Sequence, residues 1–254
     1  MAKCYWFLIR FLFTVTTTSV FCQTVSHGSA VILYLDANNI VIGADSKTTH
    51  DDKRIDTTKF CKIRQAGKIF FAVVGVPVDT LSNFDLIEII TRACADTGSF
   101  QNKIANFDKL IYLPSHRLLK RLRSVQYNDT ILFNVIFFGF EDMIPFFIGR
   151  DCNTIHTNNG EDSVVIVNVN GFIPTEQGSS TTGSMGSVRA VREYLKWRPK
   201  IFEEDGIIPA IKEMIQVAIY SEPDHVGLPI DILWVTRKGA KWIERKQECA
   251  EIKN

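Results

Sequence analysis

The sequence predicts an α+β fold, a four-layer αββα sandwich in which two antiparallel sheets pack face to face and helix pairs cover their outer sides. Apolar runs occur in adjacent pairs joined by short polar breaks, which is the signal of β-hairpins. Helical patterns also occur in pairs, and they do not alternate with single strands as they would in a parallel sheet. With 254 residues, of which 46% are hydrophobic and 22% charged, the chain can bury a full core as one domain.

The residues before the first hairpin differ from the rest of the chain. A short basic start, Met1-Ala2-Lys3, precedes a mostly apolar stretch, residues 4–20, that Arg10 interrupts. This order is typical of a secretory signal peptide, so we expect residues 1–28 to be a leader and the protein to be secreted or periplasmic. An uncleaved membrane anchor is the less favoured alternative, because the apolar part is short for a span. We expect no stable membrane span after processing, and a single domain over residues 29–254.

Two cleavage positions satisfy the preference of signal peptidase for small residues, one after Cys22 and one after Gly28. Cleavage at the second position would make Ser29 the N-terminus, and the Ser29 hydroxyl would then have a free amine as its neighbour. The sequence is compatible with both positions.

Most of the expected strands belong to hairpins. The first hairpin turns at Asp36-Ala37-Asn38-Asn39, and it places the start of one strand beside the end of the other, so Ser29 should lie near Asp45. The run at residues 68–75 is apolar throughout, which indicates a strand covered on both faces. The expected strands are residues 30–35, 40–44, 59–64, 68–75, 130–140, 143–150, 163–170, 229–236 and 241–244.

Four helical stretches follow from apolar residues at helical spacing. Pro77 should open the first helix, and Gly98 should close it. Pro114 should interrupt the second, with Ser115 capping a restart. Residues 46–58 and 171–183 are polar or rich in Gly, Ser and Thr and are expected to be loops. The expected helices are residues 77–98, 102–125, 184–197 and 207–220.

Composition also limits the function. The formal net charge of +1, without a basic block, gives no indication of a nucleic-acid partner. The five histidines are scattered and the six cysteines include no CxxC pair, so neither a metal site nor another cofactor is expected. In an oxidising compartment one or two disulfides can form among the four cysteines beyond residue 28, with the pairing left open.

The opening residues carry a resemblance to a known family. Gly28-Ser29, the run VIGADSKTT at residues 41–49, Lys59 with Ile63, and the run FAVVG at residues 71–75 resemble the proteasome β-subunit type of N-terminal nucleophile hydrolase. In that family a threonine follows a glycine, the second strand ends in an Ala-Asp-Ser-Arg-like run, and a lysine starts the third strand. The resemblance extends over nearly all of residues 29–244.

The resemblance implies a catalytic site. It places the nucleophile at Ser29, the acid that ends the second strand at Asp45, the active-site lysine at Lys59 and the oxyanion-binding N–H at Gly75. It further implies a supporting serine at Ser184 and, loosely, an acid before the last strands at Asp224. The sequence departs from the family pattern in three ways: Ser29 replaces threonine, Lys47 replaces an arginine, and no serine follows Asp224.

These residues would hydrolyse an amide bond, in a peptide or a small molecule, with no cofactor. The free α-amine of Ser29 has a pKa of roughly 8 and can act as the base that activates the hydroxyl. A lysine ammonium beside that amine would lower its pKa, and Asp45 would balance the lysine charge. The Gly75 N–H would stabilise the oxyanion.

Other interpretations stay open. Lys62 competes with Lys59 for the same role, because a spacing of three puts the two side chains on opposite faces of a strand. Asp45 could instead pair with Lys47, and Ser184 could only cap a helix. The alternative to an enzyme is a catalytically inactive, proteasome-like assembly or binding protein. Relatives of this type assemble as rings, so a homo-oligomer is a further expectation.

Overall fold

The computed structural model of the chain describes residues 29–47, 60–95, 97–125, 130–156, 161–170 and 179–250. The expected leader, residues 1–28, and most of the expected loop at 46–58 lie outside the described residues. So does Lys59, and residues 171–178 of the second expected loop lie outside them as well.

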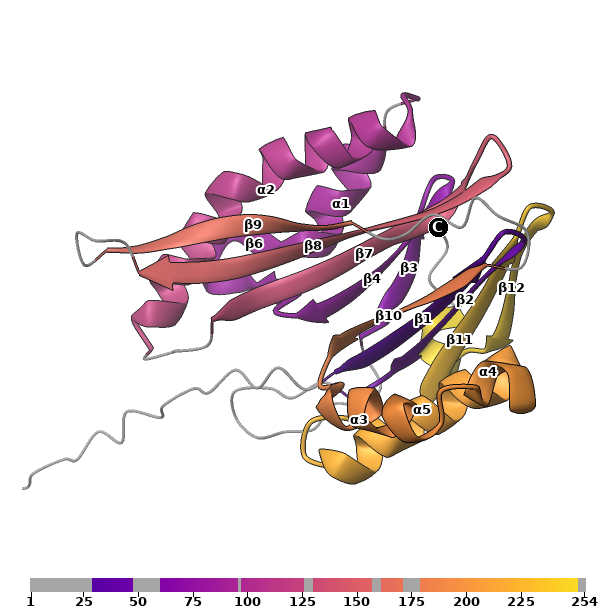
Figure 1. The fold of residues 1–254 in the computed structure, drawn as a ribbon. Helices are drawn as coiled ribbons and strands as arrows, with labels where there is room; N and C mark the ends of the chain where they lie inside the picture. Colours follow the sequence, from indigo (N-terminus) through magenta and orange to yellow (C-terminus); the bar gives the residue numbers. More distant parts are fainter. Residues whose placement is uncertain are drawn as a thin grey trace, which may run out of the picture.

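Two antiparallel five-stranded sheets form the centre of the fold (Figure 1). The first sheet has the strand order β10-β1-β2-β11-β12. Its central pair, β1 and β2, is the expected first hairpin, in which the Asp36 carboxylate accepts hydrogen bonds from the backbone N–H groups of Asn38 and Asn39 and so fixes the turn. The strands of this sheet are β1 (Ala30–Asp36), β2 (Asn39–Asp45), β10 (Ser180–Gly186), β11 (Ile230–Thr236) and β12 (Gly239–Glu244).

The second sheet has the order β3-β4-β7-β8-β9. Gly67, with a φ of 62°, allows the tight turn between β3 and β4. A two-stranded ribbon, β5 (Val78–Asp79) and β6 (Phe84–Asp85), follows β4 and encloses the short 3-10 helix η1 (Thr80–Ser82). The strands of the second sheet are β3 (Ile63–Ala66), β4 (Ile69–Gly75), β7 (Ile131–Glu141), β8 (Ile144–His156) and β9 (Asp162–Asn170).

The helices lie on the outer sides of the two sheets (Figure 1). α1 (Leu86–Cys94) and α2 (Phe100–Arg123) pack on the second sheet, and their apolar residues form one core cluster with Phe71, Phe133 and Phe137. On the first sheet lie α3 (Arg189–Trp197), α4 (Ile201–Glu204) and α5 (Ile207–Ser221), and the short α6 (Gln247–Ala250) follows the last strand.

A separate apolar cluster fills the space between the two sheets. It contains Leu33 and Ile42 from the first sheet and Phe138 and Ala72 from the second, all of them buried. Because apolar residues of both sheets meet there, each sheet is covered on both of its faces. The expected α+β class with two antiparallel sheets and helices is confirmed.

Two helix predictions are wrong in detail. The first helix starts at Leu86, not at Pro77, because residues 78–85 form the β5–β6 ribbon and Asp85 caps the helix through a hydrogen bond from the Glu88 N–H at 2.9 Å. α2 continues through Pro114 without a break. Ser115 does not cap a new helix, since its hydroxyl donates to the Ile111 carbonyl one turn earlier at 2.8 Å.

The expected loop at 171–183 and the helix start at Ser184 are also corrected. Residues 180–186 form β10, the edge strand that pairs with β1 over its full length, from Ala30 opposite Gly186 to Asp36 opposite Ser180. Thr181 and Thr182 favour a strand, but the glycine and serine residues around them do not, so pairing with β1 decides the structure. The helix then begins at Arg189.

Candidate active site

Ser29 lies directly before β1 and is buried, with 6% of its surface exposed. Its carbonyl oxygen accepts a hydrogen bond from the Ser187 N–H at 2.6 Å. A Cβ atom at Gly186 would come within 1.9 Å of the same oxygen, and Gly186 has a φ of 81°. Only glycine fits at residue 186, so the backbone after β10 can approach Ser29 closely.

The Asp45 carboxylate, at the end of β2, is fully buried and accepts four hydrogen bonds from described residues. Oδ1 accepts from the Ala30 N–H at 2.7 Å and from Lys62 Nζ at 2.5 Å. Oδ2 accepts from the backbone N–H groups of Lys47 and Gly227, each at 3.1 Å. A carboxylate has about four positions at which it can accept a hydrogen bond, and each has a donor here. Through these bonds Asp45 connects β1 to the segments that precede β3 and β11.

The lysine that pairs with Asp45 is Lys62, the residue that competed with Lys59 in the sequence. Its side chain is only 2% exposed, and the ion pair has no access to solvent. Burial lowers the pKa of Lys62 from its usual value, whereas the charge of Asp45 acts in the opposite direction. Lys47, the other candidate partner of Asp45, donates its Nζ to the Pro223 carbonyl instead.

A second buried acid and base lie beside this pair. Asp231, in β11, is 1% exposed and accepts the Lys246 N–H at 2.7 Å, while Lys246 Nζ donates to the Phe60 carbonyl. Burial raises the pKa of Asp231 and lowers the pKa of Lys246. The charge of Asp231 also favours the protonated form of Lys62, so the two acids and the two lysines interact electrostatically.

Gly75 ends β4 with a φ of 94°, a conformation that favours glycine. A Cβ atom there would lie 2.6 Å from the Leu132 carbonyl oxygen and 2.7 Å from Phe133 Cα, so no larger residue fits. The neighbouring Val74 side chain comes within 3.1 Å of the Cβ position of Gly186, which itself contacts the Ser29 carbonyl. The end of β4 and the end of β10 therefore converge on the start of β1.

Two of the residues expected at the site lie elsewhere. Ser184 is opposite Ile32 in the β1–β10 pairing, on the sheet face that packs against α3 and α5. Since alternate residues of a strand face opposite sides, it is not on the side of Val31 and Leu33. It caps no helix, because the N-cap residue of α3 is Val188. The Asp224 side chain is exposed in the turn after α5.

Two residues near the site were missed. Ser187 belongs to a second Gly-Ser pair, Gly186-Ser187, and this pair, not the one at Gly183-Ser184, comes directly before the helix. Asp231 lies between Ile230 and Ile232 in an apolar strand. A charged residue in such a run indicates a buried polar partner, because an isolated buried charge is unfavourable.

Cys61, the residue before Lys62, forms a disulfide with Cys249, and the Cα–Cα distance is 5.7 Å. It attaches the start of β3 to α6 at the C-terminal end of the described chain. Cys94 and Cys152 are buried free thiols.

In the part of the chain that the structure describes, no group of three or more His, Cys, Asp or Glu residues could hold a metal ion. None of the described helices is both long and apolar enough to cross a membrane.

The arrangement provides a buried ammonium group close to the first residue of a strand. Lys62 Nζ and the Ala30 amide nitrogen bind the same carboxylate oxygen, so the lysine lies beside the peptide group that joins Ser29 to Ala30. A lysine ammonium group beside this peptide group can lower the pKa of a neighbouring amine or stabilise a neighbouring alkoxide.

Comparison with known protein families finds no match to the sequence, and a search among curated proteins finds no relative.

Proposed function

We propose that this protein is an exported, proteasome-like N-terminal nucleophile hydrolase that cleaves amide bonds, most of all peptide bonds, with Ser29 as the nucleophile. In this proposal the leader is removed before Ser29, and the four-layer arrangement is that of the N-terminal nucleophile hydrolases. The observation that carries the proposal is the buried Lys62–Asp45 pair, whose carboxylate also binds the Ala30 N–H.

The mechanism follows from the position of each group. The α-amine of Ser29, once free, takes the proton of its own hydroxyl, directly or through a water molecule. Lys62 replaces Lys59 in the role of the active-site lysine, and its charge keeps the amine neutral and stabilises the developing alkoxide. Asp45 holds Lys62 in place, and the Gly75 N–H binds the oxyanion of the tetrahedral intermediate, which is typically worth about 10²–10³ in rate.

Ser187 takes the supporting role that was expected of Ser184, since its N–H fixes the carbonyl group of Ser29. Asp224 has no role in this mechanism because its side chain is exposed. A second buried carboxylate, Asp231, also favours the protonated form of Lys62. Metal ions and other cofactors have no part in these steps.

Determination of the N-terminal sequence of the purified protein is the first test. We expect the mature chain to begin at Ser29. A chain that begins upstream of Ser29 would exclude the mechanism in which the amine is the base. For a chain that begins at Ser29, a hydroxyl-directed electrophilic probe should label this residue, and Ser29→Ala should abolish both the labelling and the hydrolysis of peptide substrates.

Matched variants separate catalysis from folding. Lys62→Met should abolish hydrolysis at temperatures where denaturation shows that the variant is still folded, whereas Lys68→Met, which removes an exposed lysine from the turn after β3, should leave the rate unchanged. Ser163→Ala in β9 is the corresponding control for Ser29→Ala.

The alternative, an inactive assembly or binding protein, would be supported if the mature chain began at Ser29, remained folded and neither reacted with the probe nor hydrolysed any peptide. Light scattering measures the mass of the protein in solution. A mass several times that of one chain is expected for a ring, and the mass of a monomer would contradict it.

A further inference from the structure

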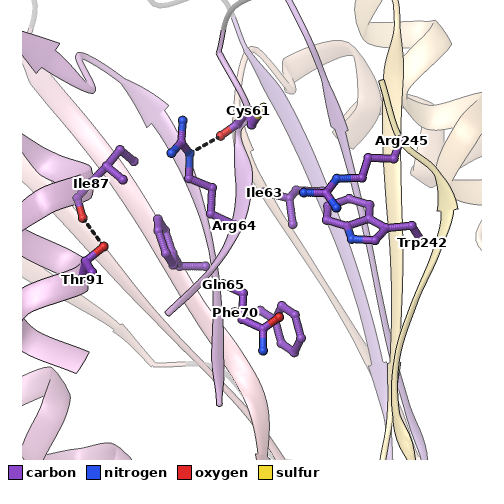
Figure 2. A pocket seen from close by; sticks show the side chains of 10 residues that line it. Cys61, Ile63, Arg64, Gln65, Phe70, Ile87, Thr91, Trp242 and Arg245 are labelled. Carbon is purple, nitrogen blue, oxygen red and sulfur yellow. Dashed lines mark hydrogen bonds between the residues drawn. The ribbon is translucent and has the colours of Figure 1, made fainter. Parts of the chain in front are cut away.

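A cavity lies across the open edge of the second sheet, apart from Ser29. It has a volume of about 190 Å³ and extends from α1 past the edge strand β3 to β12 (Figure 2). Among the described strands β3 pairs only with β4, so its other side is not covered by a neighbouring strand of the sheet. The residues that line the cavity are Cys61, Ile63, Arg64, Gln65, Phe70, Phe71, Ile87, Thr91, Trp242 and Arg245.

The charged groups that line the cavity are both guanidinium groups, and no carboxylate lines it. Arg64 donates from Nε to the Cys61 carbonyl at 2.9 Å, and within the described residues no hydrogen bond or ion pair uses its two terminal nitrogens (Figure 2). Burial lowers the pKa of Arg64. The negative charge of Asp85, the N-cap residue of α1, acts in the opposite direction. The Asp85 carboxylate accepts the capping hydrogen bond from the Glu88 N–H, and no ion pair between Asp85 and Arg64 occurs among the described residues.

Arg245 is held at the other side of the cavity. Its guanidinium lies over the Trp242 ring, 4.4 Å from the ring centroid, and Figure 2 shows it directed toward Ile63 of β3. Its Nε is buried and has no hydrogen-bond partner among the described residues. Among the described residues no hydrogen bond uses the terminal nitrogens of Arg245 either, and unlike Nε they are not buried without a partner, so an anionic oxygen in the cavity would bind them.

The walls of the cavity are fixed relative to each other before any ligand binds. The Cys61–Cys249 disulfide joins the start of β3 to the segment after β12, and Lys246, the neighbour of Arg245, donates its Nζ to the Phe60 carbonyl. Such a preformed site loses little conformational freedom on binding. The remaining lining is mostly apolar, with Ile63, Phe70 and Trp242 near Arg245.

We propose that this cavity binds a small carboxylic acid whose body is an aromatic ring or a branched aliphatic group. The carboxylate would bind the guanidinium groups, and the ring would lie against the apolar residues. A cavity of about 150 Å³ holds a benzene molecule, so the available volume accommodates a ring together with a carboxylate. The same chemistry is present in a free small acid and in the C-terminal residue of a peptide. The proposal does not depend on the activity of Ser29.

Phenylacetate is the probe for the test, with binding measured by calorimetry and by the change in tryptophan fluorescence on the full protein. We expect saturable binding, and we expect phenylacetamide, which has the same shape without the charge, to bind at least about tenfold more weakly. Arg245→Gln and Arg64→Gln should each weaken phenylacetate binding by a similar factor. Arg92→Gln, which changes an exposed arginine on α1 next to Thr91, should have no effect.

N-acetylphenylalanine distinguishes the two sources of the acid. Tighter binding than phenylacetate would indicate the C-terminal residue of a peptide, and weaker binding would indicate a free small acid. The thermal unfolding midpoint of each variant shows whether it is folded, and Arg245→Lys keeps the charge at residue 245 if Arg245→Gln does not fold. Equal affinity for phenylacetate and phenylacetamide, unchanged binding by both folded arginine variants, or no saturable binding at about 10 mM would overturn the proposal.

Discussion

Removal of the Cys61–Cys249 disulfide should destabilise the protein strongly. The bond closes a loop with a sequence separation of 188 residues, which restricts the unfolded chain over most of the domain. The chain-entropy relation for a loop of this length gives about 5 kcal/mol at room temperature. This is an upper value for the wild type compared with Cys61→Ser/Cys249→Ser, because residual structure in the unfolded chain reduces the entropic effect.

Chemical denaturation with urea, with and without a reducing agent, measures this contribution. Wild-type protein should lose about 2–5 kcal/mol of unfolding free energy on reduction. Cys61→Ser/Cys249→Ser should have about the stability of the reduced wild type, with or without the reducing agent, because Cys94 and Cys152 are free thiols that reduction does not change. Peptide mapping of non-reduced protein should recover Cys61 and Cys249 in one cross-linked fragment.

The same experiment reports on the site. Reduction frees the residue before Lys62, while the Lys62–Asp45 ion pair still holds the lysine. We therefore expect the reduced protein to be less stable and still able to react at Ser29 below its unfolding transition. Equal stability of the oxidised and reduced wild type would refute the reasoning, since it would mean that the loop is not closed or that its closure does not restrict the unfolded chain.

Three further predictions concern buried groups. Lys62→Met should lower stability by about 3–5 kcal/mol by denaturation, and Asp45→Asn/Lys62→Met should lower it by less than the sum of the single changes. Gly186→Ala should lower the unfolding midpoint sharply and Gly183→Ala only slightly, because an added Cβ would meet Ser29 O at 1.9 Å in the first case and nothing closer than 3.8 Å in the second. Burial raises the pKa of Cys152 to about 12. Its alkylation at pH 8–9 should thus be at least about 1000-fold slower in folded than in unfolded protein. Stability should fall as the pH rises from about 9 toward 12, since only the unfolded chain then releases this proton, and Cys152→Ala should reduce that pH dependence.

The hairpins were predictable because their signals are local. β1 and β2 are apolar runs around an Asn-rich turn, and the structure keeps them within one or two residues of the expected bounds. β10 was missed because its glycine and serine residues outweigh the strand preference of its two threonines, and its structure comes from pairing with β1, a chain segment about 150 residues earlier. The continuity of α2 through Pro114 has a similar origin, because buried residues such as Phe107 and Leu118 hold both halves of the helix on the same sheet.

The candidate site was predictable only where it depends on adjacent strands. Ser29 and Asp45 come together because a hairpin joins their strands, which the sequence indicates directly. The choice between Lys59 and Lys62 depends on the path of the chain between β2 and β3, and no local pattern contains that information. Asp231 and Lys246 belong to segments about 170–185 residues further along the chain than Lys62, and only the fold brings them to it.

The buried charged groups around Lys62 are an energetically unfavourable means of stabilising a fold. Moving an ammonium and a carboxylate out of water is unfavourable by several kcal/mol each, and well-packed apolar residues in place of such a pair are often equally or more stabilising. Asp45 nevertheless accepts bonds from three separate backbone N–H groups besides Lys62, one of them on Ala30, the residue after Ser29. These backbone donors satisfy most of the hydrogen-bonding capacity of the carboxylate, while Lys62 balances its charge, so removal of Lys62 alone leaves an uncompensated buried charge. A buried ammonium group at this position is accounted for if it acts on the amine and hydroxyl of Ser29, as the proposed hydrolase requires. If Lys62→Met lost stability and Ser29 nevertheless kept its full reactivity, the pair would be structural.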